Sequence, residues 1–390
     1  MRIKKTIFDI VLLLSGSYFI LKPFYLWRSG LPQISDIVIA LAILLFFISK
    51  GFRIYIYPSA RNLTIFTFLF VMWIVLVNMV WGVLLYGSLQ ITVKSIYYLY
   101  NFFVLLFFQN IINIEFRLTH KIIYFSVIFS LSLQVILLIF RLPSSNVGRV
   151  SLFFNNPNQL AYNNLLFLSI LILLGDRIEV KKFWNLIGII FSTILVVVSM
   201  SKAGIISLVG ILTFLLFFEI YNQKSFFKKI LILFFLFFVT FLLVQQISEM
   251  AESSVFFRNI VNRFIIRQSD DSLVARGYDR ILRFPEYLAF GAGEGDYKRF
   301  GYGIEIHSTF GNILMSYGVI GFILFGIIIF IVYKKSKFGN FYLMFFQLVY
   351  GLAHNGLRNT LFWILMVLIT MNFSVKNDTY EIELNRKKVF

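Results

Sequence analysis

Polar and basic residues gather at a few places in a chain that is otherwise strongly apolar. The stretch GRVSLFFNNPNQLAYNNLL, residues 148–166, holds one arginine, five asparagines, a glutamine and a proline. Asparagine is a preferred helix N-cap and proline is favoured at the first helical position, so Asn156 and Pro157 predict the start of a helix. Capping does not account for Arg149 and Asn158, which are therefore candidates to bind a ligand.

Three other apolar segments begin in the same way, with a residue that can cap a helix beside a basic or ionisable side chain. The N-terminus of a helix carries the positive end of its dipole, and a neighbouring cation makes it a site for anions such as phosphate. The alternative is that these basic side chains only reach toward lipid head groups. The three starts are Ser201-Lys202, His307-Ser308 and Arg358-Asn359.

Three arginines follow one another at helical spacing in a more polar part of the chain. Arg276, Arg280 and Arg283 are separated by 4 and 3 residues, which places them on one face of a helix. Such a face could hold a diphosphate or a sugar phosphate. Asp279 and Glu286 lie close enough in sequence to neutralise part of it, so a solvated charged face is the alternative.

His307 is the candidate general base among the three histidines. It stands at a helix start, where the dipole disfavours the imidazolium and so favours the neutral ring that a base needs. Glu305 is two residues away and could orient His307 or act itself. His354 is a weaker candidate, and a purely structural histidine is the alternative.

No metal and no cofactor is expected. The chain has no cysteine, which excludes disulfides, cysteine metal sites and thiol catalysis. No group of side chains has the spacing of metal ligands.

Composition predicts an all-α polytopic membrane protein. The 390 residues are 59% hydrophobic and 14% charged, with 49 phenylalanines and a mean hydropathy of +0.84. Repeated apolar runs are typical of membrane helices. About 12 transmembrane helices are expected, with 10–12 as the range: 7–23, 34–49, 63–86, 91–109, 122–140, 158–175, 183–200, 203–220, 228–246, 308–333, 339–352 and 358–373.

Lysine and arginine predict the orientation of these helices. The short segments on one side of the expected membrane hold 21 of them and those on the other side hold 7, so both termini are placed in the cytoplasm. The net charge of +18 lies mostly in these short loops, which argues against a nucleic-acid partner. The expected organisation is helices 1–9 in 1–246, an extracytoplasmic loop in 247–307, helices 10–12 in 308–373 and a cytoplasmic tail in 374–390.

The loop 247–307 is the one sizeable extramembrane segment, and it is expected to contain short helices. Its apolar residues recur at helical spacing before Pro285, which should end that helix. A flexible turn is expected after it at Gly291, Gly293 and Gly295. The helically spaced residues are Leu273, Val274, Tyr278, Ile281 and Leu282.

Four stretches, in this order, resemble the bacterial O-antigen polymerase and O-antigen ligase superfamily. GRVSLFFNNPNQLAYNNLL is similar to its arginine-containing segment before a helix, with Leu152 where a glycine is common. SMSKAGIISLVGIL is similar to a helix start that usually has arginine at the position of Lys202. ARGYDRILRFPEYLAFGAGEGDYKRF and HSTFGNILMSYGVIGFILF resemble its arginine-containing loop and its histidine-then-helix motif. The resemblance spans about 142–333.

This resemblance implies a metal-independent glycosyltransferase at the outer face of the bacterial cytoplasmic (inner) membrane. Its donor would be a glycan on undecaprenyl pyrophosphate, and its partners would be membrane lipids and a chain-length regulator protein. His307 would be the base, with Arg149 and Arg276 also catalytic. The implied substrate-binding residues are Lys202, Arg280, Arg283, Asn156, Asn158, Glu305 and Arg358.

Three alternatives remain open beside a polysaccharide polymerase for O-antigen or capsule. A ligase would transfer the glycan to the lipid A–core of lipopolysaccharide. A transporter usually buries charges in mid-membrane, and here only Asp9 and Lys94 come near such a position. A non-catalytic scaffold would not need cations at several outer helix ends. The polymerase is favoured for the compact length and the Asn-Pro-Asn-Gln run.

Overall fold

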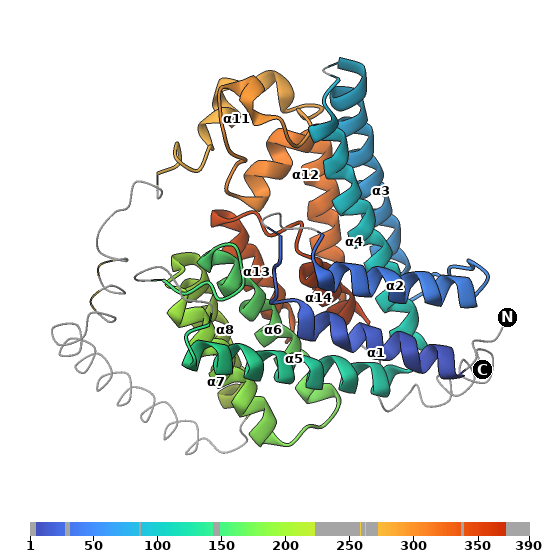
Figure 1. Cartoon of the computed structure of the whole chain (residues 1–390). Helices are drawn as coiled ribbons and strands as arrows, with labels where there is room; N and C mark the ends of the chain where they lie inside the picture. Colours follow the sequence, from blue (N-terminus) through green and yellow to red (C-terminus); the bar gives the residue numbers. More distant parts are fainter. Residues whose placement is uncertain are drawn as a thin grey trace.

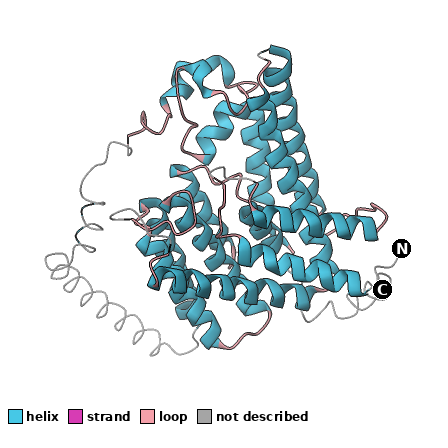
Figure 2. Cartoon of the chain, in the orientation of Figure 1, coloured by secondary structure: helices cyan, strands magenta, loops and turns pink. Residues whose placement is uncertain are grey.

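The computed structural model describes residues 5–27, 32–85, 87–142, 149–222, 272–336 and 339–371, together with Arg258 and Asn262. These residues form helices and loops, and the described part of the chain contains no strand (Figure 2). The fold class is therefore all-α, as predicted.

Eleven longer helices make up most of the described residues. They are α1 (Lys5–Leu21), α2 (Ile34–Ser49), α3 (Arg61–Met79) continued by the π-helix η1 (Val80–Leu85), α4 (Leu89–Ile114), α5 (Phe116–Ile139), α6 (Pro157–Arg177), α7 (Lys182–Val198), α8 (Lys202–Asn222), α12 (Thr309–Lys335), α13 (Phe341–Ala353) and α14 (Thr360–Thr370). Between α8 and α12 the described residues form α11 (Asp279–Arg283) and two 3-10 turns, η3 (Pro285–Tyr287) and η4 (Tyr297–Phe300).

Eleven of the twelve apolar segments predicted from the sequence coincide with one of these long helices. The remaining segment, 228–246, lies outside the described residues. Most of the loop before 272 and the tail after 371 lie outside them too. Among the described residues, six helices are long and apolar enough to cross a membrane: Arg61–Leu84, Leu89–Ile114, Phe116–Ile139, Pro157–Arg177, Lys202–Tyr221 and Thr309–Lys335. Several apolar helices thus indicate a membrane protein.

Two helices, α6 and α14, form the centre of the fold (Figure 1). All 11 residues of α14 are buried, and it contacts α4, α6, α12 and α13. In α6 the whole run 160–175 is buried. The peripheral helices instead expose large apolar side chains, such as Phe129 on α5 and Phe217 on α8. This pattern suits a helical bundle whose outer surface faces lipid.

The glycine turn after α11 packs into a kink in α12. Gly318 has φ +66°, which interrupts the helix and leaves the carbonyls of Met315 and Ser316 free to accept new hydrogen bonds. The backbone N–H groups of Ala292 and Gly293 donate to these two carbonyls, both at 2.9 Å. The turn therefore completes the backbone hydrogen bonding of the kink.

Gly318→Ala should destabilise the fold. Residue 318 has a left-handed conformation, and an added Cβ would lie 2.5 Å from the carbonyl oxygen of Ala289. Such strain costs on the order of 1–3 kcal/mol of unfolding free energy. Thermal unfolding of the purified protein in detergent measures it. Gly326→Ala, in the same helix with open space around it, is the control and should be neutral or stabilising. Equal melting temperatures for the two variants would contradict the role of the kink.

Candidate functional site

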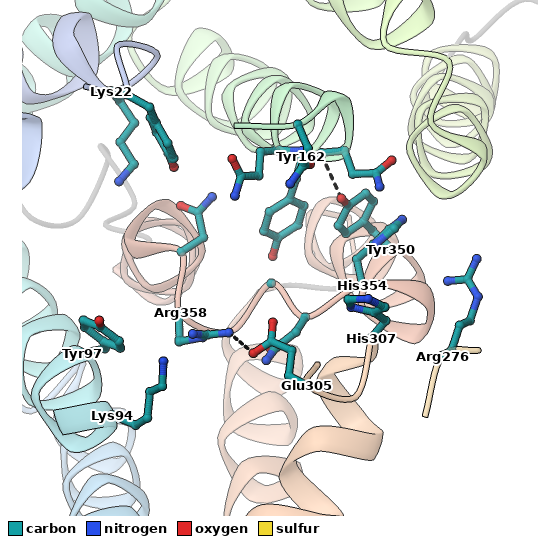
Figure 3. A pocket seen from close by; sticks show the side chains of 17 residues that line it. Lys22, Lys94, Tyr97, Tyr162, Arg276, Glu305, His307, Tyr350, His354 and Arg358 are labelled. Carbon is teal, nitrogen blue, oxygen red and sulfur yellow. Dashed lines mark hydrogen bonds and ion pairs between the residues drawn. The ribbon is translucent and has the colours of Figure 1, made fainter. Parts of the chain in front are cut away.

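A polar cavity opens where the N-terminal ends of α6, α12 and α14 meet the C-terminal ends of α1 and α13 and the second turn of α4 (Figure 3). Six of the predicted catalytic and substrate-binding residues line it: Asn156, Asn158, Arg276, Glu305, His307 and Arg358. They come from four separate stretches of the chain, so the fold brings together motifs that the sequence shows only apart.

Each of the three helix N-termini at the cavity is capped by the side chain of the residue that precedes the helix. Asn156 accepts a hydrogen bond from the N–H of Gln159 at 2.9 Å, Ser308 from Gly311 at 3.2 Å and Asn359 from Leu361 at 3.1 Å. The capping roles predicted for these residues are confirmed. Three positive dipole ends therefore converge on one cavity, which favours a negatively charged group there.

Arg149 lies behind the cavity wall and does not line it. Its Nη2 donates to Asn158 Oδ1 at 2.9 Å, and its Nε donates to the carbonyl of Ser199 at 3.1 Å. Asn158 lines the cavity, so Arg149 connects this wall with the segment that leads into α8. Lys202, the first residue of α8, is also absent from the cavity lining.

Arg276 and His307 are held next to each other at the cavity. The backbone N–H of His307 donates to the carbonyl of Arg276 at 3.0 Å, and Arg276 Nη1 donates to the carbonyl of Ala353 at 2.6 Å. Both side chains line the cavity, together with His354, whose ring packs against Tyr350 at 4.9 Å. This backbone hydrogen bond therefore keeps the cation Arg276 close to His307, the candidate base.

The prediction that Arg276, Arg280 and Arg283 share one helical face is wrong. Gly277 has φ +75°, which breaks the helix between Arg276 and α11. Arg280 is 1% exposed, and its guanidinium carbon lies 4.0 Å from the centre of the Tyr302 ring. Burial lowers the pKa of Arg280. Arg283 is 63% exposed and pairs with Asp279 at 3.2 Å. Neither Arg280 nor Arg283 lines the cavity.

Arg358 is held between two carboxylates. It forms an ion pair with Glu305, and its Nε lies 3.4 Å from Glu294 Oε1. Glu305 is therefore engaged by Arg358, whereas the sequence suggested that it orients His307 or acts itself. Glu294 is fully buried and accepts hydrogen bonds from the hydroxyls of Tyr98 at 2.7 Å and Tyr317 at 2.5 Å.

No protein-family model matches this chain, and no curated protein matches it. In the part of the chain that the structure describes, no group of three or more histidine, aspartate or glutamate side chains could hold a metal ion.

Several cavity residues were not singled out as site residues in the sequence. Lys22 was counted only as an outer charge, Lys94 was noted otherwise only as a charge near mid-membrane, and the four lining tyrosines were not singled out. Lys22 is 1% exposed and pairs with Asp36 at 3.2 Å. Lys94 lies over the ring of Tyr97, 5.4 Å from its centre. The lining tyrosines are Tyr25, Tyr97, Tyr162 and Tyr350. The cavity thus combines cations, amides and aromatic rings.

Proposed function

We propose that this protein is a polysaccharide polymerase that transfers a glycan from undecaprenyl pyrophosphate to the next lipid-linked repeat unit. The observation that supports it best is the convergence of Arg276 and His307 on one cavity with three helix N-termini. Guanidinium groups and helix N-termini stabilise a diphosphate. Amide and tyrosine side chains, such as Asn158 and Tyr162, suit the hydroxyls and faces of sugars.

In the proposed reaction, an acceptor hydroxyl oxygen attacks the anomeric carbon of the donor sugar. A new glycosidic bond forms as the bond from that carbon to the diphosphate oxygen breaks. The diphosphate leaves with the bonding electrons, and Arg276 and the start of α12 stabilise its growing charge. His307 takes the proton of the acceptor hydroxyl. It is preferred to Glu305 as the base because Arg358 already engages the Glu305 carboxylate.

The lipid part of both substrates fits the apolar outer surface of the helices. We place the cavity at the outer face of a bacterial cytoplasmic membrane, with both termini in the cytoplasm, because lysine and arginine are concentrated in the loops of the opposite side. Ten to twelve spans and a chain-length regulator as partner belong to this proposal. A ligase would perform the same chemistry on a lipid A–core acceptor, and the choice of acceptor in the assay below separates the two.

His307→Gln should lower the rate of glycan transfer about 100-fold, because the amide can donate and accept hydrogen bonds but cannot take up the proton. The measurement uses purified protein in lipid nanodiscs with a lipid-linked repeat unit, and it follows the ladder of polymer lengths on a gel. His354→Gln is the matched control, since His354 also lines the cavity but has no assigned proton transfer.

A rate close to wild type for His307→Gln would show that His307 is not the base. Glu305→Gln would then be the next variant to assay. A wild-type protein that moves the lipid-linked unit across a bilayer, without forming polymer, would identify a transporter instead.

A further inference from the structure

We infer that the half of the cavity formed by Lys22, Lys94, Tyr97, Arg358 and Glu305 binds the acceptor sugar and is not a second diphosphate site. The inference rests on the proposed function, and it assigns one substrate to one part of the cavity. In Figure 3, Lys22, Lys94, Tyr97 and Arg358 lie on one side, and Tyr350, His354, His307 and Arg276 lie on the other.

The positive charges of this half already have carboxylate partners. Lys22 pairs with Asp36 in a site from which water is almost excluded, at 1% and 3% exposure. Arg358 pairs with both Glu294 and Glu305. A diphosphate bound here would lie against Glu305 and would compete with Asp36 and Glu294 for the cations that they already pair with. Like charges at contact distance oppose each other strongly where water is excluded.

Lys94 completes the charge balance. It lies within electrostatic range of Arg358 and of the carboxylates of Glu294 and Glu305. The three cations of this half, Lys22, Lys94 and Arg358, are therefore matched by three carboxylates. Glu305 lines the cavity, and Asp36 and Glu294 are buried outside its lining. A neutral ligand keeps this balance, whereas a diphosphate disturbs it.

The same groups match a sugar. Each hydroxyl of a sugar both donates and accepts hydrogen bonds, so it is best held between donors and acceptors. Lys94 supplies donors, Glu305 supplies acceptor oxygens, and both line the cavity. Tyr25 and Tyr97 add aromatic rings and hydroxyls to the same wall. Glu305 is 24% exposed, so part of its carboxylate is accessible from the cavity.

The direction of the reaction also places the acceptor here. In a displacement at the anomeric carbon, the attacking hydroxyl and the leaving diphosphate take opposite sides of that carbon. Arg276 stands at one end of the cavity, and His307 lies between it and Arg358 (Figure 3). With the diphosphate at Arg276, the acceptor hydroxyl reaches His307 from the side of Lys94 and Tyr97.

Binding of two separate probes tests the assignment. The first probe is the repeat-unit oligosaccharide of the host polysaccharide on an octyl chain, and the second is inorganic pyrophosphate. Lys94→Met should weaken octyl-glycoside binding about tenfold, because a charge-assisted hydrogen bond is lost, and leave pyrophosphate binding unchanged. Arg276→Ala should weaken pyrophosphate binding. Calorimetric titration of the full-length protein in nanodiscs measures both.

Matched variants keep the result interpretable. Tyr97→Phe keeps the ring and should weaken glycoside binding less than Lys94→Met, and Lys94→Arg should largely restore it. Lys298→Met changes an exposed lysine outside the cavity and should bind both probes as wild type does. Loss of pyrophosphate binding in Lys94→Met, with glycoside binding intact, would overturn the inference. If Lys94→Met weakens only glycoside binding but the wild type forms no polymer, the sugar subsite stands and the proposed function fails.

Discussion

Arg276→Ala should lower the rate of glycan transfer about 100- to 1,000-fold, which is the usual loss when one group that stabilises developing negative charge is removed. Arg276 lines the cavity, and its backbone carbonyl holds the N–H of His307. The alanine variant keeps that backbone contact, so the base should stay in place while the diphosphate loses its guanidinium. The rate of polymer formation in nanodiscs measures the effect.

Arg283→Ala is the control for this experiment. Arg283 was predicted from the sequence to belong to the same face, but it is exposed, pairs with Asp279 and does not line the cavity. It should transfer glycan at nearly the wild-type rate. Arg276→Lys should recover part of the activity, because lysine keeps the charge but not the paired donors of the guanidinium. Wild-type activity in Arg276→Ala would remove Arg276 from the mechanism.

Glu294→Ala should lower the free energy of unfolding by about 3–5 kcal/mol, the cost of breaking a buried ion pair by removing one partner. The Glu294 carboxylate contacts Arg358, Tyr98 and Tyr317. The backbone N–H of Glu294 donates a hydrogen bond to Asn78 Oδ1 at 2.9 Å. The hydroxyls of the two tyrosines would also lose their shared acceptor. Thermal or denaturant unfolding in detergent measures the loss.

Two glutamine variants test whether the loss of stability comes from the charge of Glu294 or from removing any acid of this loop. Glu294→Gln keeps the size of the side chain and should destabilise less than Glu294→Ala. Glu286→Gln changes an exposed acid of the same loop and should leave stability unchanged. If Glu294→Ala melts at the wild-type temperature, then Glu294 does not hold the loop to the helices.

Helix starts could be predicted from the sequence because their signals are local. Asn156-Pro157, Ser308 and Asn359 each act on backbone N–H groups two or three residues away, and the structure confirms all three caps. Apolar runs likewise fixed the approximate bounds of the long helices. Such features depend on neighbouring residues only, so one sequence is enough to find them.

The composition of the cavity could not be predicted in the same way. Lys22 and Arg358 line one cavity although they are more than 300 residues apart. Whether Lys94 points to lipid, water or the cavity depends on how α4 is rotated against its neighbours. The charge of Glu294 gave no indication of its burial, since its partners Tyr98 and Arg358 come from other helices or loops. These contacts exist only once the helices have packed.

The arginines of the loop show how a single backbone angle can defeat a spacing argument. Arg276 and Arg280 have helical spacing, but the positive φ of Gly277 turns the chain between them. Glycine adopts this conformation at little cost, and its presence in the sequence does not say whether it does so. Arg276 therefore reaches the cavity while Arg280 packs against Tyr302.

The central position of α14 determines when the interior and the cavity are completed during synthesis of the chain. α14 follows in chain order all the helices that surround it, namely α4, α6, α12 and α13. Chains are made and begin to fold from the N-terminus, so these helices exist before the one that fills the space between them. Arg358 and Asn359 arrive with α14 and complete the cavity. Completion of the interior and assembly of the cavity are therefore the same late event.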